Sequence, residues 1–372
     1  MSSFFTKIHK SLSVIKHRKK FVNCDTYYPE CERKTSWQIM QDQISFVWKY
    51  GDYEPFYFTY GFDRKEMTRE RIDEEYILPS SLFQSRLKDI NRHGKLTGGK
   101  LTGMLLTADK FYFNVLLERF GTPTPKVFLF VKNQHPLYID QNFEVDTNLS
   151  AEAQLKQFFS YEMDAFAKPY NGQLGMGCFS VRIKDGKVLV DGKESSVADL
   201  ISVVLSADYL VQECVYQHPK MAELNGSSIN SIRLQTVMDK NGIVHPFGAG
   251  LRIGREGNTV DNWAMGGVFV GIDMEKGTLM EMGFMKPQFG TSVKEHPDTH
   301  VRFDGFEIPY YKEAETMAVR LHSFLYRSHS IGWDIAITDH GPVFIEGNSL
   351  WEISLVQAVH GGLKKEIEHF FE

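Results

Sequence analysis

The sequence is poor in cysteine and lacks the cysteine patterns that predict a redox or zinc site. Its cysteines form no CxxC motif and show no zinc-ligand spacing, so reduced thiols in a cytoplasmic protein are favoured over a disulfide framework. Long apolar runs are missing too. No segment reaches the roughly 18 apolar residues that span a bilayer, and the N-terminus has no continuous apolar core of a signal peptide. The cysteines are Cys24, Cys31, Cys178 and Cys214.

An excess of positive charge is also absent, and the formal net charge of −5 argues against a general nucleic-acid binder. The composition, 42% hydrophobic and 24% charged in 372 residues, is that of a soluble globular protein. Residues 1–20 differ, because they contain no acid and place apolar residues among basic ones at helical spacing. This segment could touch an anionic membrane surface, or it could be a solvated basic helix docked on its own domain. Its basic residues are Lys7, Lys10, Lys16, Arg18, Lys19 and Lys20.

Familiar nucleophile and phosphate-loop patterns are missing as well. The histidines form no ligand-spaced cluster, and no Ser-His-Asp or Cys-His pattern has local support. The repeated pentamer GKLTG at 94–103 lacks the spacing of a Walker A loop, so we interpret it as a connector at a domain boundary. Residues 1–105 are expected to be mostly helical, with helices at 36–50 and 80–92 and no catalytic grouping.

After residue 107 the sequence alternates between helix, strand and hairpin signals. Thr107 is expected to cap a helix that ends at Gly121 and that places Lys110 in its first turn. Strand and hairpin signals follow, interrupted by predicted helices at 196–206 and 311–328 and by two short C-terminal helices. This mixture predicts an α+β fold rather than a doubly wound parallel sheet.

A hairpin is predicted near the C-terminal end. Two short apolar runs flank Asp339-His340-Gly341, whose glycine can take a positive φ. Pairing of Thr338 with Pro342 across this three-residue loop would place Asp334 directly opposite Glu346. Opposite residues of antiparallel strands have Cβ atoms roughly 4.5–5.5 Å apart, and two like charges at that distance are destabilising. A divalent cation between them would remove this penalty.

The same hairpin supplies ligands that suit magnesium. Asn348 lies two residues after Glu346, so strand alternation puts its amide oxygen on the same face as that carboxylate. Asp334, Glu346 and Asn348 together offer hard oxygen ligands, and Mg²⁺ usually takes its remaining ligands from water and substrate phosphates. A surface hairpin with solvated acids is the alternative. The apolar residues around these acids favour the metal site, because burial of unpaired carboxylates is costly.

A glycine-rich segment, AKPYNGQLGMGCFSV, joins two predicted strands. Glycines there allow backbone N–H groups to approach phosphate closely, and Lys168 at the end of the first strand can reach the same phosphates. The pattern is similar to the strand-loop-strand cover of kinases, and an ordinary glycine-rich hairpin loop is the alternative. The glycines are Gly172, Gly175 and Gly177.

Two arginines lie on predicted strands that the turn at 240–242 joins. The pairing set by this turn places Arg233 and Arg252 on neighbouring parts of one surface, where they could grip a phosphate or carboxylate bidentately. Exposed strand arginines without a ligand are the alternative. Further polar contacts to a substrate are expected from Asn230, Asp261 and Asn262.

Together these segments resemble the ATP-grasp superfamily, and the sequence is most similar to its sugar-transfer-associated ATP-grasp family. The resemblance extends from about Leu106 to about Trp351, two thirds of the chain. It is carried, in the family's order, by the motifs DKFYFNVLLERFGTPTP, AFAKPYNGQLGMG, LVQECVYQHP, SSINSIRLQTV, DNWAMGG and GWDIAITDHGPVFIEGN.

The resemblance implies that a nucleotide is clamped between two α+β subdomains, at 106–212 and 213–372, which follow a mostly helical region at 1–105. In the first subdomain, Lys110 and Lys168 would contact the phosphates of ATP. In the second, the hairpin ligands match the metal set of the family. The implied cofactors are therefore ATP and Mg²⁺.

The resemblance also implies a hinge strand beside the adenine, in the segment QECV. Many relatives place a second acid after the hinge to hold the ribose, but Lys220 stands near that position here. His218 or Glu223 could substitute for it, and the ribose contact is left open. The hinge residues expected to contact the nucleotide are Gln212, Glu213 and Val215.

The implied reaction is an ADP-forming ligation that yields an amide through an acylphosphate, with Arg233 and Arg252 acting on the transferring group. The expected substrates are an amino acid and a sugar or sugar-nucleotide precursor of surface polysaccharide, with no nucleic acid as partner. Two alternatives are a phosphotransferase that acts on a sugar hydroxyl, and a nucleotide-bound adaptor that recruits glycan enzymes to a membrane through residues 1–20.

Overall fold

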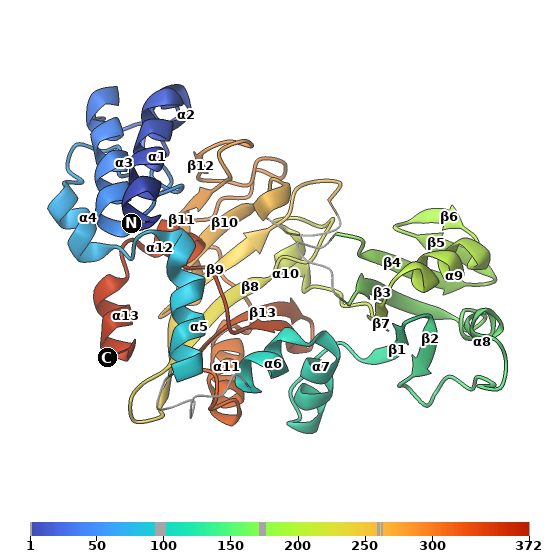
Figure 1. The fold of residues 1–372 in the computed structure, drawn as a ribbon. Coiled ribbons are helices and arrows are strands. Elements are labelled where there is room, and N and C mark those ends of the chain that lie inside the picture. The colour runs from blue at the N-terminus through green and yellow to red at the C-terminus, as the bar shows by residue number, and fades with distance from the viewer. Residues whose placement is uncertain (1, 94–101, 171–175, 259–260, 262, 372) are drawn as a thin grey trace.

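The protein, in a computed structural model, is a mixed α+β structure with two seven-stranded antiparallel sheets and a helical N-terminal region, as the sequence predicts. Figure 1 shows the first sheet at one end of the molecule, the second in the middle and the N-terminal helices at the other end. Three predicted site residues, Gly172, Gly175 and Asn262, lie outside the described residues. The described residues are 2–93, 102–170, 176–258, 261 and 263–371.

Short helices and turns make up residues 2–93. The predicted helix at 36–50 is α3, which begins with a capping box between Thr35 and Gln38 and ends at Gly51, where φ is +91°. The helix predicted at 80–92 is α5, preceded by a single 3₁₀ turn. The elements are α1 Ser2–Lys16, α2 Arg18–Val22, α3 Ser36–Tyr50, α4 Arg69–Glu75, η1 Ser80–Leu82 and α5 Phe83–His93.

The first sheet has the strand order β2-β1-β7-β3-β4-β5-β6, and helices α8 Ala151–Phe158 and α9 Val197–Ser206 cover one of its faces. That face buries alternate strand residues such as Ala165 and Val211. The opposite face carries a smaller apolar cluster and the Lys168 side chain. The strands are β1 Val127–Lys132, β2 His135–Tyr138, β3 Met163–Pro169, β4 Phe179–Lys184, β5 Lys187–Val190, β6 Lys193–Ser195 and β7 Tyr209–Glu213.

The second sheet has the order β12-β11-β10-β9-β8-β13-β14. Helix α11 Tyr311–Phe324 packs on one face through residues such as Ala318 and Leu321, while α12 Ile353–His360 lies against β9, β10 and β11. The strands are β8 Ile232–Met238, β9 Val244–Ile253, β10 Val268–Asp273, β11 Thr278–Phe284, β12 Ser292–Val293, β13 Ser330–Thr338 and β14 Gly341–Asn348. The short elements are α10 Pro219–Ala222, η2 Trp263–Met265 and α13 Lys364–Phe371.

The helix predicted to start at Thr107 is instead two helices, α6 Thr102–Ala108 and α7 Lys110–Arg119. The cap of α7 is Asp109, whose carboxylate accepts hydrogen bonds from the backbone N–H groups of the next turn. Thr107 cannot cap, because its hydroxyl donates to the Met104 carbonyl within α6. Lys110 still lies in the first turn, as predicted.

The N-terminal region packs on the second sheet rather than forming a separate body. Aromatic residues of 27–76 share a core with Phe269, Phe284 and Ala358, and the Tyr27 hydroxyl donates to the Met285 carbonyl at 2.6 Å. Helices α6 and α7 also lie against the second sheet, although the sequence groups them with the first subdomain. Within the described residues, none of the helices is both long enough and apolar enough to cross a membrane.

Candidate active site

The β13–β14 hairpin reaches the predicted pairing by a different route. Its loop has two residues rather than three, because Thr338 pairs with Gly341, whose φ is +110°. An irregularity between Asp334 and Ile335 then shifts the ladder by one residue. As a result, Asp334 lies opposite Glu346, as the sequence predicts.

Asp334 is held by both predicted arginines. Its carboxylate accepts hydrogen bonds from Nε and Nη2 of Arg233 at 2.6 and 3.0 Å, and Nη1 of Arg252 lies 3.1 Å from Oδ2. The β8–β13 register places Arg233 directly beside Asp334, and Gly250 stands opposite Arg233 on β9, two residues before Arg252. The three charged side chains therefore lie on one face of the second sheet.

Asp334 is only 6% exposed. This burial raises the pKa of its carboxyl group, and Arg252 opposes that rise. The two guanidinium groups thus compensate for the desolvation of the carboxylate. A buried, hydrogen-bonded cluster of this kind is rigid and is costly to break by removing one member.

Asp261 joins the same cluster from the loop before η2. Its carboxylate accepts hydrogen bonds from the backbone N–H of Ser231 at 2.8 Å and from the Ser231 hydroxyl. Burial raises the pKa of Asp261 to about 6, and the nearby Arg252 opposes this. Arg252 thus contacts one aspartate, Asp334, and influences the charge of a second, Asp261.

Lys168 comes to the site from the first subdomain. It lies on β3 opposite Leu210 of β7 and is only 7% exposed. No hydrogen bond or ion pair links its ammonium to any residue of the described ranges. Burial lowers the pKa of Lys168 to about 8, Glu346 of the other subdomain opposes this shift, and Lys110 adds to it. Lys168 is thus a buried cation suited to an anionic ligand.

Lys110 and Gly177 lie near the same strand end. The Lys110 ammonium donates to the Pro169 carbonyl at 3.3 Å, next to Lys168 in the chain. Gly177 has a φ of +76°, and its carbonyl accepts a hydrogen bond from the Tyr209 hydroxyl at 3.1 Å. The structure therefore brings both lysines and the last glycine of the glycine-rich segment to one end of β3.

The predicted hinge is the end of β7. Gln212 is 3% exposed, and its Oε1 has no hydrogen-bond partner among the residues that the structure describes. Glu213 is exposed and its carboxylate accepts a long hydrogen bond, 3.4 Å, from the Lys126 N–H. Val215 is half-buried in the connection that leads to the second subdomain.

His218 and its neighbours are engaged in a helix cap. Nδ1 of His218 accepts a hydrogen bond from the Lys220 N–H at 3.0 Å, which caps α10, and the His218 N–H donates to the Ile337 carbonyl. The Lys220 ammonium pairs with Glu223 at 2.9 Å. Lys220 stands where many relatives have the ribose-binding acid. It is therefore paired with Glu223, one of the two residues that could substitute for that acid.

Asn230 does not lie where a substrate could reach it. The residue has no exposed surface, and its Nδ2 donates to the carbonyls of Met221 and Asn225 and to Oε1 of Gln217. Its Oδ1 accepts from the Gly254 N–H at 3.3 Å. These bonds use the whole amide, so the expected substrate contact is replaced by a structural role that fixes the start of β8.

The predicted metal ligands fit a magnesium ion in chemistry, although no group of three or more His, Cys, Asp or Glu side chains in the described ranges forms a ready metal site. Glu346 and Asn348 project from β14, and neither side chain forms a hydrogen bond to a described residue. Asp334 is the exception, since both arginines already hold it. The set therefore offers two uncommitted oxygen ligands and a third that the arginines share.

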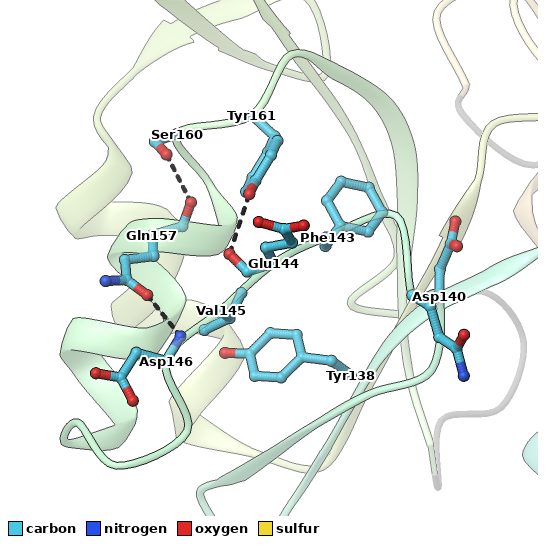
Figure 2. A pocket seen from close by; sticks show the side chains of 10 residues that line it. Tyr138, Asp140, Phe143, Glu144, Val145, Asp146, Gln157, Ser160 and Tyr161 are labelled. Atoms are coloured by element: carbon cyan, nitrogen blue, oxygen red, sulfur yellow. Dashed lines mark hydrogen bonds between the residues drawn. The ribbon is translucent and has the colours of Figure 1, made fainter.

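One surface hollow lies away from the charged cluster. It measures about 760 Å³ and lies in the first subdomain beside α8. Figure 2 shows Tyr138 and Phe143 on one side of it and Gln157 and Tyr161 on the other. None of its lining residues is a predicted site residue, so its size does not bear on the charged cluster.

Comparisons with known proteins identify the class. Residues 100–371 match the family described as sugar-transfer associated ATP-grasp, which is well over half of the chain. The protein is therefore an ATP-grasp protein. Within that class it belongs to the sugar-transfer associated family, as the resemblance of its motifs predicted. A comparison with curated proteins finds no match.

Solved ATP-grasp structures are similar at low identity. D-alanyl-alanine synthetase A from Vibrio cholerae is 12% identical with a TM-score of 0.41, over 80% of this chain and 71% of that one. L-amino acid ligase from Bacillus licheniformis is 11% identical with a TM-score of 0.37, over 80% and 55%. N5-carboxyaminoimidazole ribonucleotide synthetase from Thermotoga maritima is 12% identical with a TM-score of 0.33, over 66% and 42%.

The chain thus spans about half the length of several structures that it matches. Some of these proteins were solved with ADP, and one with the magnesium salt of ADP.

Sequence reasoning missed the ion pairs that join the predicted arginines to the predicted metal ligand. It treated Arg233 and Asp334 as parts of two separate sites. The signal that could have joined them is the pairing of β8 with β13, but about ninety residues separate these strands and no turn sets their register. The link between Asp261 and Ser231 was missed for the same reason.

Proposed function

We propose that the protein is an ATP- and Mg²⁺-dependent carboxylate–amine ligase that acts through an acylphosphate. The observation that carries this proposal is Lys168, a buried cation without a described partner, in the electrostatic environment of Glu346 from the other subdomain. Burial of an unpaired charge is costly, and a nucleotide phosphate is an anion that would pair with it. Membership of an ATP-grasp family supports the same ligand.

In this proposal the first subdomain binds the nucleotide. Lys110 and Lys168 hold the phosphates, and Gly177 lies at the same end of β3. The unsatisfied Oε1 of Gln212 is suited to accept a hydrogen bond from the adenine amino group. Contacts to the base and ribose are completed by Glu213, Val215 and His218.

Glu346, Asn348 and Asp334 would hold Mg²⁺ in the second subdomain. When bound, the metal would supply positive charge to the phosphates, and its other ligands would be water and phosphate oxygens. Because Asp334 also pairs with the arginines, it would fix the two guanidinium groups beside the metal position.

The side chains suit a reaction that needs charge neutralisation rather than a protein nucleophile. The carboxylate oxygen of one substrate attacks the γ-phosphorus, the bond to the β-phosphate oxygen breaks, and ADP leaves. The amine of the second substrate then attacks the acyl carbon, loses a proton, and expels phosphate to give the amide. Arg233 and Arg252 would stabilise the charge on the transferring group.

A sugar or sugar-nucleotide is proposed as one substrate and an amino acid as the other. The family description, which refers to sugar transfer, supports the first. Asp261 and Asn262 would contact the acceptor, and the influence of Arg252 on the pKa of Asp261 supports this for Asp261. A role in surface polysaccharide biosynthesis in the cytoplasm, at the inner side of a membrane, would place the enzyme where such precursors are made.

The proposal can be tested by identifying the products and by following a carboxylate oxygen of the substrate into the released phosphate. Protein, Mg²⁺ and ATP are incubated with pooled amino acids and uronic or amino sugars, and products are identified by mass spectrometry, with the Glu346→Gln variant as background control. Once the acceptor carboxylate is known, labelling it with ¹⁸O should deliver one labelled oxygen to the released phosphate. Unlabelled phosphate during amide formation would falsify the acylphosphate. A phosphorylated sugar without amide would instead identify a phosphotransferase, and ATP binding without turnover an adaptor.

A further inference from the structure

Helix α1 turns its apolar side toward solvent. Phe4 and Phe5 are 55% and 68% exposed, and Leu12 and Ile15 are 59% and 48% exposed. At 100° per residue these four side chains fall within one sector of the helix, which a soluble protein normally buries. The exposed ring of Trp48 on α3 extends this surface, since it contacts Phe4 with ring centroids 5.8 Å apart.

The opposite side of α1, which includes the fully buried Val14, is also tied to α3 by polar contacts. The ammonium of Lys7 donates to the Trp48 carbonyl at 2.7 Å, and that of Lys10 donates to the Gly51 carbonyl at 3.0 Å. Lys10 also pairs with Asp52 at 2.8 Å. These carbonyls lie at the C-terminal end of α3, where the helix dipole favours cations. The orientation of α1, apolar side outward, is therefore specified by named contacts.

A cluster of cations borders the apolar stripe. Its members lie at the end of α1 and the start of α2, and each of them is exposed. No ion pair links them to any residue within the described ranges. Residues 1–20 contain no acid that could neutralise it. The cluster is Lys16, Arg18, Lys19 and Lys20.

We propose that this surface docks the protein on an anionic lipid bilayer, with the α1 stripe in the headgroup region and the cations on lipid phosphates. Apolar area beside unpaired lysines is the combination that binds anionic interfaces, and tryptophan favours the same depth. A second copy of the chain is a poorer occupant, because the two basic clusters would face each other and repel. This inference does not depend on the proposed ligase chemistry.

The position of α1 suits such docking. Figure 1 shows α1 and α2 at the end of the molecule away from the first sheet, so a bilayer there would not cover the surface between the two sheets. A membrane-bound enzyme could then still take up substrates, including ones attached to lipid.

The test is sedimentation of the full-length protein with vesicles of phosphatidylcholine, alone or with phosphatidylglycerol. We expect binding to the anionic vesicles and little to the neutral ones. The variant Phe5→Ser/Leu12→Ser and, separately, Lys16→Glu/Lys19→Glu should each reduce bound protein about tenfold or more. The matched control is Leu137→Ser/Ile243→Ser, two positions 51% and 56% exposed far from α1, which should bind like the parent.

Melting temperatures of all variants should equal that of the parent, because the altered side chains are exposed, and a lowered value would exclude that variant from the comparison. Equal binding to neutral and anionic vesicles would overturn the role of the lysines. No binding by the parent would overturn the proposal. Light scattering that shows a dimer, lost in Phe5→Ser/Leu12→Ser, together with no vesicle binding, would identify a second copy as the true occupant.

Discussion

The two subdomains bring charge to the candidate site in opposite ways. The second sheet contributes Asp334 already neutralised by Arg233 and Arg252, while the first contributes Lys168, buried and without a partner in the described ranges. A neutralised cluster belongs to the folded state itself, since its members compensate one another's desolvation. An unpaired buried cation instead lowers the stability of the ligand-free protein and raises its affinity for an anionic ligand. The difference teaches that changes on the two sides should separate stability from ligand binding.

The largest effects are expected in the hairpin. Glu346→Gln should lower turnover at least about 100-fold and should destabilise the protein less than Asp334→Asn, because Glu346 forms no hydrogen bond or ion pair with a described residue and loses only its electrostatic attraction to Lys168 and Arg252. Asp334→Asn should also abolish turnover, but it should destabilise the protein by about 3–5 kcal/mol, since it breaks a buried pair and leaves two guanidinium groups uncompensated. Steady-state kinetics and urea unfolding separate the two outcomes.

Asn348→Ala serves as the control for that comparison. Water can replace a neutral ligand, so this variant should keep measurable turnover at saturating Mg²⁺ and normal stability. If Asp334→Asn unfolds at the same urea concentration as the parent, the three-residue cluster does not contribute to stability as its geometry suggests.

Arginine replacements should lower kcat by about 10–100-fold. Both variants keep the charge, but Arg233→Lys loses the bidentate contact with Asp334 and Arg252→Lys loses the single Nη1 contact, so the chemical step should suffer more than nucleotide affinity. Pre-steady-state measurements with saturating ATP report the step directly. A defect confined to ATP binding would assign these arginines to the nucleotide phosphates instead.

Lys168→Met should separate binding from stability most clearly. Nucleotide affinity, measured by calorimetry with a non-hydrolysable ATP analogue, should fall about tenfold or more because the phosphates lose a partly desolvated cation. The melting temperature of the nucleotide-free protein should rise, since an unpaired buried charge is removed. Lys126→Met, at an exposed lysine that pairs with Asp140, is the control and should leave affinity unchanged. A lower melting temperature for Lys168→Met would show that the ammonium is paired after all.

The smallest effect is a pH dependence. Burial lowers the pKa of Lys168 from 10.5 to about 8, so between these values the unfolded chain binds more protons at this residue than the folded one. The contribution of Lys168 to unfolding free energy should therefore rise as pH increases from about 8 toward 10.5. Urea unfolding of the parent and of Lys168→Met across this pH range isolates the contribution of Lys168. If the two free energies of unfolding change with pH in parallel, the prediction is contradicted.

Local signals predicted much of the fold. The capping box at Thr35 and the glycine at 51 set the ends of α3, and turn residues located the hairpins. The prediction of Thr107 as a helix cap was wrong, because Asp109 stands closer to α7 and its carboxylate reaches two N–H groups. Thr107 and Asp109 are both residues that can cap a helix, and the sequence does not show at which of them the backbone becomes helical.

The sequence by itself determined that Asp334 and Glu346 face each other, that Lys110 begins a helix and that the chain belongs among ATP-grasp proteins. Each of these depends on short-range spacing, on strand alternation or on motif order, all of which are written within a few residues.

Only the tertiary structure decided that Arg233 holds Asp334, that Asn230 is consumed by internal hydrogen bonds, and that α1 turns its apolar side outward. Register between β8 and β13 is set by packing across a long connection, and the face that a helix buries depends on the surface it meets. Such long-range choices depend on the free energy of the whole fold, so no local pattern of residues encodes them.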